Sequence, residues 1–415
     1  MKKYLIFIVG FCFLISCVEP FEFQTETFQD ALVIEASLTN ETKRHRVVLS
    51  RAVRFEDSIN APERNAQVRL LDEMQNTYEF SESEPGTYVS NTEFAAQKGV
   101  GYTLAIETTD GTVYRSKTER FESESEIQEI YAERETNDQG EDGIFVYADS
   151  FDSSGQSLYH RYEYEETYKI IAPNWSPLAF ELTNYEPCNP DFMDPRIIYD
   201  LEIVRRTQEE QTCYNTVASQ DIIQASAAGL SETKVQRFPV RFIPGSDFIL
   251  THRYSILVKQ YVQSADAFSY YQSLENFSSS TSVFTEIQPG LLEGNIAAEN
   301  NADKLVLGYF EVASVSEKRL FFGFRDFYPD EPFPLYVMNC VPFSAPLEHI
   351  SYCFQGMVGN PCPESLIEGM ARGAISYFDV NTSDIECQGP YTVVQRECGD
   401  CTALGSNIVP DFWEE

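Results

Sequence analysis

Residues 101–116, GYTLAIETTDGTVYRS, contain the clearest fold signal in the chain. The first half places Tyr, Leu and Ile at every second position, which is the period-two pattern of a half-buried β-strand. The Asp110-Gly111 pair in the middle favours a tight turn, because glycine accepts the positive φ angle that such turns require. Strand-forming residues resume after the turn, so the stretch predicts an antiparallel β-hairpin.

Short strands of the same kind fill residues 30–122. Residues 32–38 are a run of strand formers, apolar and polar residues alternate at 66–70 and 78–80, and no helical period interrupts them. About seven such strands separated by turn residues are typical of a β-sandwich. The order of these motifs resembles carboxypeptidase-regulatory-like and prealbumin-like domains. We therefore expect an immunoglobulin-like (prealbumin-like) β-sandwich over residues 30–122.

Residues 123–415 predict a larger β-rich domain with a few helices. Strand-forming runs recur at residues 127–131, 143–148, 159–171, 201–206, 248–262 and 304–312. Segment 265–277 has the apolar period of a helix, and a second helix is expected over 220–228. Residues 326–337 combine Asp, Pro and aromatic side chains, which indicates an extended loop.

The N-terminal residues, MKKYLIFIVGFCFLISC, predict an export signal. Two lysines precede an apolar run that is too short to span a bilayer. The run ends in Leu-Ile-Ser-Cys17, which fits the lipobox that is cleaved before the cysteine that receives acyl chains. We therefore expect a lipoprotein signal peptide over 1–16, a lipid anchor on Cys17 and an acidic tether over 17–29. An ordinary signal peptide with a chance cysteine is the alternative.

Cysteines are concentrated in the last quarter of the chain. Besides Cys12 and Cys17, the candidates for disulfide bonds are Cys188, Cys213, Cys340, Cys353, Cys362, Cys387, Cys398 and Cys401. An even number in an exported protein favours disulfides. We expect Cys188 to bond Cys213 and the six later cysteines to pair among themselves, giving a disulfide-rich C-terminal segment. A zinc site at the last three cysteines is the alternative, but it would need thiolates that stay reduced.

Acidic side chains dominate the chain. It carries 30 Lys and Arg against 65 Asp and Glu. Residues 1–16 hold two lysines and no acid, so the formal charge without them is −37. A surface this acidic repels nucleic acid, and we expect no nucleic-acid partner.

The sequence offers no recognisable catalytic motif. It has four histidines and no G-x-S-x-G element. His45 and His252 lie beside arginines in strand-forming runs, where a solvated strand face is expected. Two Asp- and Gly-rich turns, at 138–143 and 149–155, contain only fragments of a calcium loop. We therefore expect no catalytic residue, no metal site, no cofactor and no enzymatic activity.

One strand has an aromatic face. Its members at 159–168 are Tyr159, Tyr162, Tyr164 and Tyr168. They are the candidates for stacking on sugar rings, although tyrosines are also ordinary strand formers.

Three further stretches carry a family resemblance: PGLLEGNI at 289–296, VLGYF at 306–310, and the ending CGDCTALGSNIVPDFW at 398–413. With the lipobox and the N-terminal sandwich, the chain resembles the Bacteroidota outer-membrane lipoproteins catalogued as domain of unknown function 4249. The resemblance implies a protein of no established activity, from a family whose members are often encoded beside TonB-dependent receptors.

These observations predict a lipid-anchored accessory or binding protein of the outer membrane that is the partner of a TonB-dependent transporter. The partner contact is expected from residues 123–415, including the aromatic loop 326–337. Whether the protein lies on the cell surface or on the periplasmic face stays open. A surface carbohydrate-binding or hydrolytic lipoprotein is the alternative.

Overall fold

The computed structural model describes residues 31–52, 61–152, 154–187, 198–229, 233–279, 292, 294–301, 304–348, 365–383, 385 and 388–415. This part is mainly β, as predicted, and its strands form one large sheet and three smaller ones. No helix in these ranges has the length and apolar character needed to cross a membrane. The expected signal peptide over 1–16, the tether over 17–29 and Cys17 lie outside the described residues.

The first eight strands belong to one end of the molecule, which we call the N-terminal unit. They are β1 (Ala31–Thr39), β2 (Arg46–Arg51), β3 (Ala61–Pro62), β4 (Gln67–Asp72), β5 (Thr77–Glu84), β6 (Thr87–Ser90), β7 (Tyr102–Glu107) and β8 (Val113–Ser116). The predicted hairpin is β7–β8, in which Ile106 faces Tyr114. Gly111 has a φ angle of +79° in the turn. Alternate side chains of these strands point inward and form a sandwich-like core around Leu32, Leu104 and Tyr114.

Two strands from much later in the chain complete the N-terminal unit. β18 (Ile296–Ala298) pairs with β8, and the first half of β19 (Leu305–Phe322) runs parallel to β1. Ile296, Phe310 and Val312 lie in the same core as the early strands. The expected range 30–122 therefore lacks two strands of the unit.

Glycine is required where β19 approaches β1. Gly308 has a φ angle of +126°, and a Cβ atom built there would lie 2.0 Å from the carbonyl oxygen of Ile34. A larger residue would force the two backbones apart, because a carbonyl oxygen cannot move aside like a flexible side chain.

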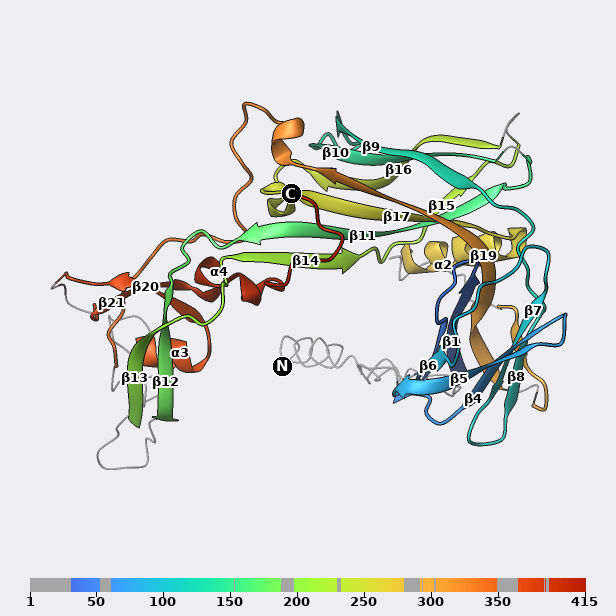
Figure 1. Cartoon of the computed structure of the whole chain (residues 1–415), viewed down its shortest axis with the longest axis horizontal. Helices are drawn as coiled ribbons and strands as arrows, with labels where there is room; N and C mark the ends of the chain where they lie inside the picture. Colours follow the sequence, from blue (N-terminus) through green and yellow to red (C-terminus); the bar gives the residue numbers. More distant parts are fainter. Residues whose placement is uncertain are drawn as a thin grey trace, which may run out of the picture.

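The second half of β19 enters a central unit made of two facing sheets (Figure 1). The larger sheet continues in the order β14–β11–β17–β19, and the smaller one has the order β16–β10–β9. Besides β19, the strands of the central unit are β9 (Glu126–Thr136), β10 (Asp142–Phe151), β11 (Tyr159–Ile171), β14 (Thr212–Ala218), β15 (Ile223–Ser226), β16 (Lys234–Pro244) and β17 (Tyr254–Val262). Inward side chains of both sheets, including Val146, Tyr162 and Ile256, share one core.

A small distal unit lies at the opposite end of the central unit from the N-terminal unit (Figure 1). Its elements are β12 (Leu178–Glu186), β13 (Ile198–Arg205), α3 (Leu366–Ala371), β20 (Ile375–Val380) and β21 (Tyr391–Gln395). Ala345, Leu366 and Val393 form its core. β19 thus belongs to both the N-terminal unit and the central unit. The distal unit is instead built from chain segments that lie between or after the strands of the central sheet.

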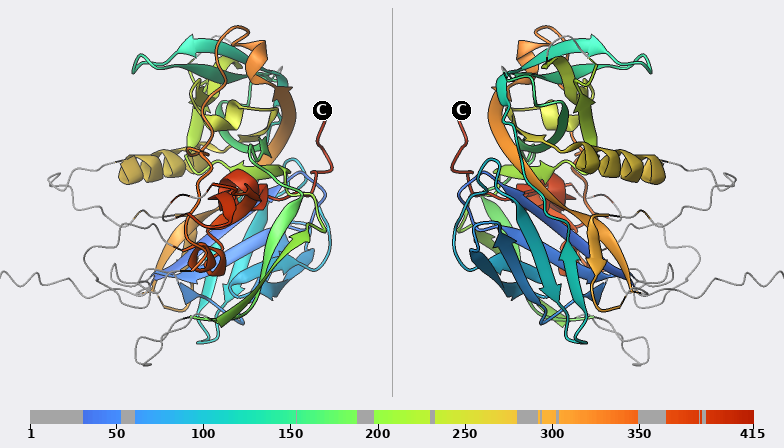
Figure 2. Two further views of the ribbon diagram at one scale, coloured as in Figure 1. Left: turned by 90° about the vertical axis from the view of Figure 1, so that its left-hand side faces the viewer. Right: turned by 90° about the vertical axis from the view of Figure 1, so that its right-hand side faces the viewer.

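One helix prediction is confirmed and the other is wrong. α2 (Ala265–Ser279) covers the predicted segment 265–277 and projects from one side of the central unit (Figure 2). The helix expected over 220–228 is instead the strand β15, which pairs with the start of β11. Pairing with an open sheet edge here outweighs the local helical pattern. Two short 3-10 turns, η2 (Phe248–Leu250) and η3 (Phe324–Asp326), flank the central sheets.

Candidate protein-interaction site

The C-terminal cysteines connect the distal unit to the rest of the chain. Cys213 of β14 is bonded to Cys401, and Cys340 is bonded to Cys398. The expected Cys188–Cys213 bond is therefore wrong, and so is the expectation that all six later cysteines pair among themselves. The reason is that the C-terminal segment folds back beside β14, where Tyr214 and Ser406 form a β-bridge. Nearness in the sequence did not indicate nearness in space.

The other expected disulfide cysteines, Cys188, Cys353, Cys362 and Cys387, lie outside the described residues. Cys398 and Cys401 each form a disulfide bond with a different cysteine, so neither supplies a free thiolate to the alternative zinc site. Within the described ranges, no group of three or more His, Cys, Asp or Glu side chains is placed to hold a metal.

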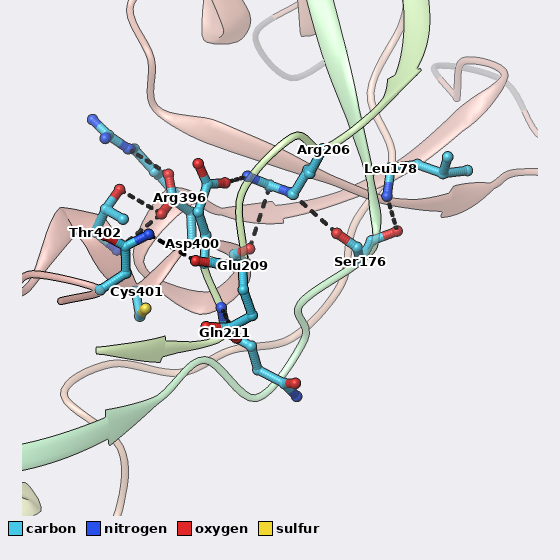
Figure 3. A network of polar contacts seen from close by, with 12 residues as sticks. Ser176, Leu178, Arg206, Glu209, Gln211, Arg396, Asp400, Cys401 and Thr402 are labelled. Carbon is cyan, nitrogen blue, oxygen red and sulfur yellow. Dashed lines mark hydrogen bonds and ion pairs between the residues drawn. The ribbon is translucent and has the colours of Figure 1, made fainter. Parts of the chain in front are cut away.

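Arg206 fixes the turn between Cys398 and Cys401 to the base of the β12–β13 hairpin (Figure 3). Its Nε donates to the carbonyl oxygen of Ser176 at 3.1 Å, and Nη2 donates to that of Gly399 at 3.4 Å. Its guanidinium also pairs with Glu210. Burial lowers the pKa of Arg206. Because the guanidinium of Arg206 is bonded to Ser176, Gly399 and Glu210, we assign it a structural role in holding these segments together.

Asp400 holds the same turn from within. Its carboxylate accepts hydrogen bonds from the Thr402 backbone N at 2.9 Å and hydroxyl at 2.6 Å (Figure 3). Arg396 donates to it at 3.3 Å. The two disulfides and these bonds make the turn between α4 (Arg396–Gly399) and η5 (Cys401–Ala403) a rigid attachment point.

An extended segment without helix or strand, residues 329–343, is attached to this turn, and we call it the strap. Its first end is fixed by Arg325, whose Nη1 donates to the carbonyl oxygens of Tyr328, Pro329 and Glu331 at 3.1, 3.0 and 2.6 Å. Arg134 of β9 pairs with Glu331 at 2.7 Å and lies 4.0 Å from the ring centre of Tyr328. Burial and then Asp142 raise the pKa of Tyr328 to about 12.

The middle and far end of the strap are fixed as well. Tyr336 points inward and donates its hydroxyl to the carbonyl oxygen of Glu397 at 2.9 Å. Burial, with Glu397 nearby, raises the pKa of Tyr336 to about 12. Cys340 is bonded to Cys398, and Phe343 exchanges two backbone hydrogen bonds with Val393 of β21. The strap is thus held in one extended conformation.

The strap presents a row of apolar side chains to solvent. Their exposed fractions are 48% for Phe333, 87% for Leu335, 43% for Val337, 62% for Val341 and 39% for Phe343. Exposed apolar side chains that lie scattered singly need no explanation, but these five follow one another within residues 333–343, and a gathering of exposed apolar side chains is typical of an interaction site. The row is therefore the candidate functional site.

The predicted loop 326–337 covers only part of this site. Of its aromatic residues, Phe327, Tyr328 and Tyr336 pack against the central core. Phe333 is half exposed, and its ring contacts Phe324 and Arg325. Composition indicated an extended segment here. Leu335, Tyr336 and Val337 show no polar–apolar alternation, so the sequence held no signal for which of them is exposed.

The other residues considered from the sequence have structural roles. His45 is 2% exposed, so the expected solvated face is wrong; it precedes β2 and packs against Phe94. Burial lowers the pKa of His160 to about 4. Tyr162, Tyr164 and Tyr168 lie in the central core and do not form a sugar platform. The fourth member of that group, Tyr159, packs against Phe268 of α2.

The Asp-rich turn at 149–155 is satisfied within the chain. Burial by itself would raise the pKa of Asp152, but hydrogen bonds from Ser154, Gln156 and Ser157 outweigh burial and lower it. These are bonds of a turn.

A buried charged cluster lies where β19 passes from the N-terminal unit to the central unit. Arg161 of β11 pairs with Glu311 of β19 at 2.9 Å, and their side chains are 10% and 2% exposed. Gln263 donates to the second oxygen of Glu311 at 2.7 Å. The guanidinium carbon of Arg161 lies 4.3 Å from the ring centre of Tyr261 and 5.0 Å from that of Tyr271 on α2. The cluster fixes α2 and both units to one another.

Comparisons with known proteins place the chain in a family but not in a function. No curated protein matches it. A solved structure to which it is similar is a DUF4785 family protein from Legionella pneumophila, at 7% identity and a TM-score of 0.18, over 50% of this chain and 56% of that one. A likeness this weak carries no argument.

A family model matches residues 18–319, which ends before the strap begins. This range includes the N-terminal unit and most of the central unit. The chain belongs to the family described as Domain of unknown function (DUF4249).

Proposed function

We propose that the protein is a lipid-anchored, non-enzymatic accessory protein of the outer membrane in a Bacteroidota bacterium, and that it binds a TonB-dependent transporter through the strap. The observation that carries the proposal is the row of five exposed apolar side chains on a segment fixed at both ends. A segment that is already ordered loses little conformational entropy on binding, which favours its use as a contact surface.

The position of the strap supports the same role. The anchor expected on Cys17 is joined to β1 by a tether of about a dozen residues, which spans at most roughly 40 Å. The N-terminal unit is then held close to the membrane. The strap runs from the central unit to the distal unit, at the other end of the molecule (Figure 1). A partner embedded in the same membrane contacts the strap if part of that partner extends above the bilayer.

Charge narrows the kind of partner. The chain has a formal charge of −35, and the two charged residues of the strap, Asp330 and Glu331, are both acidic, with Glu331 paired to Arg134. A protein this acidic fits a partner with a basic rim, and it does not fit an anionic lipid surface.

The test is affinity purification of the tagged protein from gently solubilised outer membrane, with quantitative mass spectrometry. Wild type should recover a barrel protein at comparable abundance. Leu335→Asp with Val337→Asp should reduce that recovery at least about tenfold, since central apolar contacts carry most of the energy of an interface. Met74→Asp is the matched control, because Met74 is 50% exposed in the N-terminal unit. Recovery of wild type without a barrel would refute the proposal.

A further inference from the structure

The outer face of the central sheet gathers cations and aromatic rings in one row. Lys169 of β11 pairs in register with Tyr214 of β14, and its backbone N donates to the carbonyl oxygen of Arg253, which precedes β17. Phe321 and Arg319 follow on β19, the next strand of the sheet. The row holds three cations, Lys169, Arg253 and Arg319, of which Arg319 also pairs with Glu165 of β11 at 3.8 Å. We call this row the seat.

The seat is occupied by aromatic side chains from residues 407–415, which we call the tail. The guanidinium carbon of Arg319 lies 3.5 Å from the ring centre of Phe412. Trp413 meets the rings of Tyr214 and Phe321 edge-on, with ring centres 4.8 and 5.8 Å apart. Contacts of both kinds are favourable and depend on geometry.

A carboxylate of the tail completes the match. Glu415 pairs with Lys169, with nitrogen–oxygen distances of 2.9 and 3.0 Å. The hydrogen bond from Lys169 lowers the pKa of Glu415, and Arg253 contributes to the same shift. The seat thus recognises two aromatic rings followed by an acidic side chain.

Side chains alone hold the tail on the sheet. Backbone pairing with β14 ends at Ser406. From Ile408 onward, within the described part of the chain, the tail's backbone donates to the Ser406 hydroxyl and, within the tail, from Trp413 to Pro410. Ile408 and Val409, which lead into the seat, are 74% and 55% exposed. In Figure 1 the dark red end of the chain crosses β14 and β11 as a coil that is not part of the sheet. A segment attached in this way can leave without breaking the sheet.

We infer that the seat is a peptide-binding site, that the tail occupies it as an internal ligand, and that a partner segment with two aromatic residues followed by acidic residues replaces the tail. Charge complementarity sets the occupant, because Lys169 and Arg253 favour an acidic side chain at one end of the seat, as they do Glu415. The competition is intramolecular, and a short tether gives the tail an effective concentration on the order of millimolar. The intact chain is therefore largely closed to a free peptide until a tighter partner arrives.

The test uses a fluorescent peptide with the sequence of residues 409–415, VPDFWEE, and fluorescence anisotropy. A chain that ends at Asn407 should bind this probe, and the intact chain should bind it at least about tenfold more weakly because the tail competes. Phe412→Ala with Trp413→Ala in the full-length chain is a second way to free the seat and should also restore binding. Circular dichroism of each variant checks that the sheet is intact.

Controls separate the seat from other surfaces. A probe in which Phe and Trp are alanine should not bind, and Arg319→Glu in the truncated chain should abolish binding of the original probe. Binding should weaken with added salt. Three outcomes would overturn the inference: no binding to either freed chain, equal binding to the intact and truncated chains, or an intact-chain dimer that dissociates on Phe412→Ala with Trp413→Ala. The last would mean that the occupant is a second copy exchanging its tail.

Discussion

Replacing Glu311 by alanine should destabilise the protein far more than breaking an exposed ion pair. Arg161 and Glu311 are nearly inaccessible to solvent, so the change leaves a buried guanidinium without its main partner. Burial alone would lower the pKa of Arg161, but Glu311 and neighbouring groups outweigh it and raise the pKa, so the side chain stays charged. Loss of one member of a buried pair costs about 3–5 kcal/mol.

Urea unfolding at 25 °C, followed by circular dichroism, measures this cost. With a dependence of about 3 kcal/mol per molar urea, the midpoint of the transition should fall by roughly 1–2 M. The matched control is Glu299→Ala, which breaks the exposed pair with Arg115, whose side chains are 35% and 45% exposed. That change should cost at most about 1 kcal/mol.

A double variant distinguishes the charge from the packing. Arg161→Met with Glu311→Leu replaces the pair by apolar groups of similar size and should recover most of the lost stability, because no buried charge then remains. The reasoning is refuted if Glu311→Ala unfolds at the same urea concentration as Glu299→Ala, or if the double variant is less stable than Glu311→Ala.

Three further predictions concern the backbone, a buried histidine and the anchor. Gly308→Ala should destabilise the protein by about 2 kcal/mol or more, because the backbone φ of Gly308 is positive and the new Cβ would meet the Ile34 carbonyl. Gly111→Ala is the control, because Gly111 has a positive φ but open space around it, and it should cost about 1 kcal/mol in the same urea assay. Burial lowers the pKa of His160 to about 4, so the unfolded chain binds the extra proton first and stability falls as pH drops from about 6.5 towards 4. Lowering the pH from 7 to 4.5 should reduce the free energy of unfolding of the wild type by about 2 kcal/mol more than that of His160→Gln. If the unfolding free energies of the two proteins change with pH in parallel, the prediction is wrong. Cys17→Ala should leave an unacylated precursor that no longer fractionates with the outer membrane, as checked by mass spectrometry and membrane fractionation; normal fractionation would remove the lipoprotein hypothesis.

The parts of the fold that depend on local pattern could be predicted from the sequence. The β7–β8 hairpin follows from alternation around Asp110-Gly111, and α2 follows from its apolar period. The pairing of β19 with β1 could not be predicted in the same way. Residues 31–39 and 305–313 are both strand-forming runs, but nothing in either run specifies the other as its parallel neighbour.

The same limit explains the disulfides and the site. Cys213 and Cys401 are 188 residues apart, and only the folding of the C-terminal segment beside β14 brings them together. Proline and aromatic content indicated an extended loop at residues 326–337, but the burial of Tyr328 and Tyr336 depends on the central core beneath them. The outward row that remains at Leu335 and its neighbours is a property of the packed chain.

The most direct test of the proposed role is site-specific photo-crosslinking in living cells. A photoreactive amino acid replaces Leu335, which is 87% exposed on the strap, or Met74, which is 50% exposed in the N-terminal unit. Mass spectrometry then identifies what each position reaches. The proposal predicts an adduct between position 335 and an outer-membrane barrel of the TonB-dependent type, with little or none from position 74. No barrel adduct at position 335, or the same adducts at both positions, would contradict it.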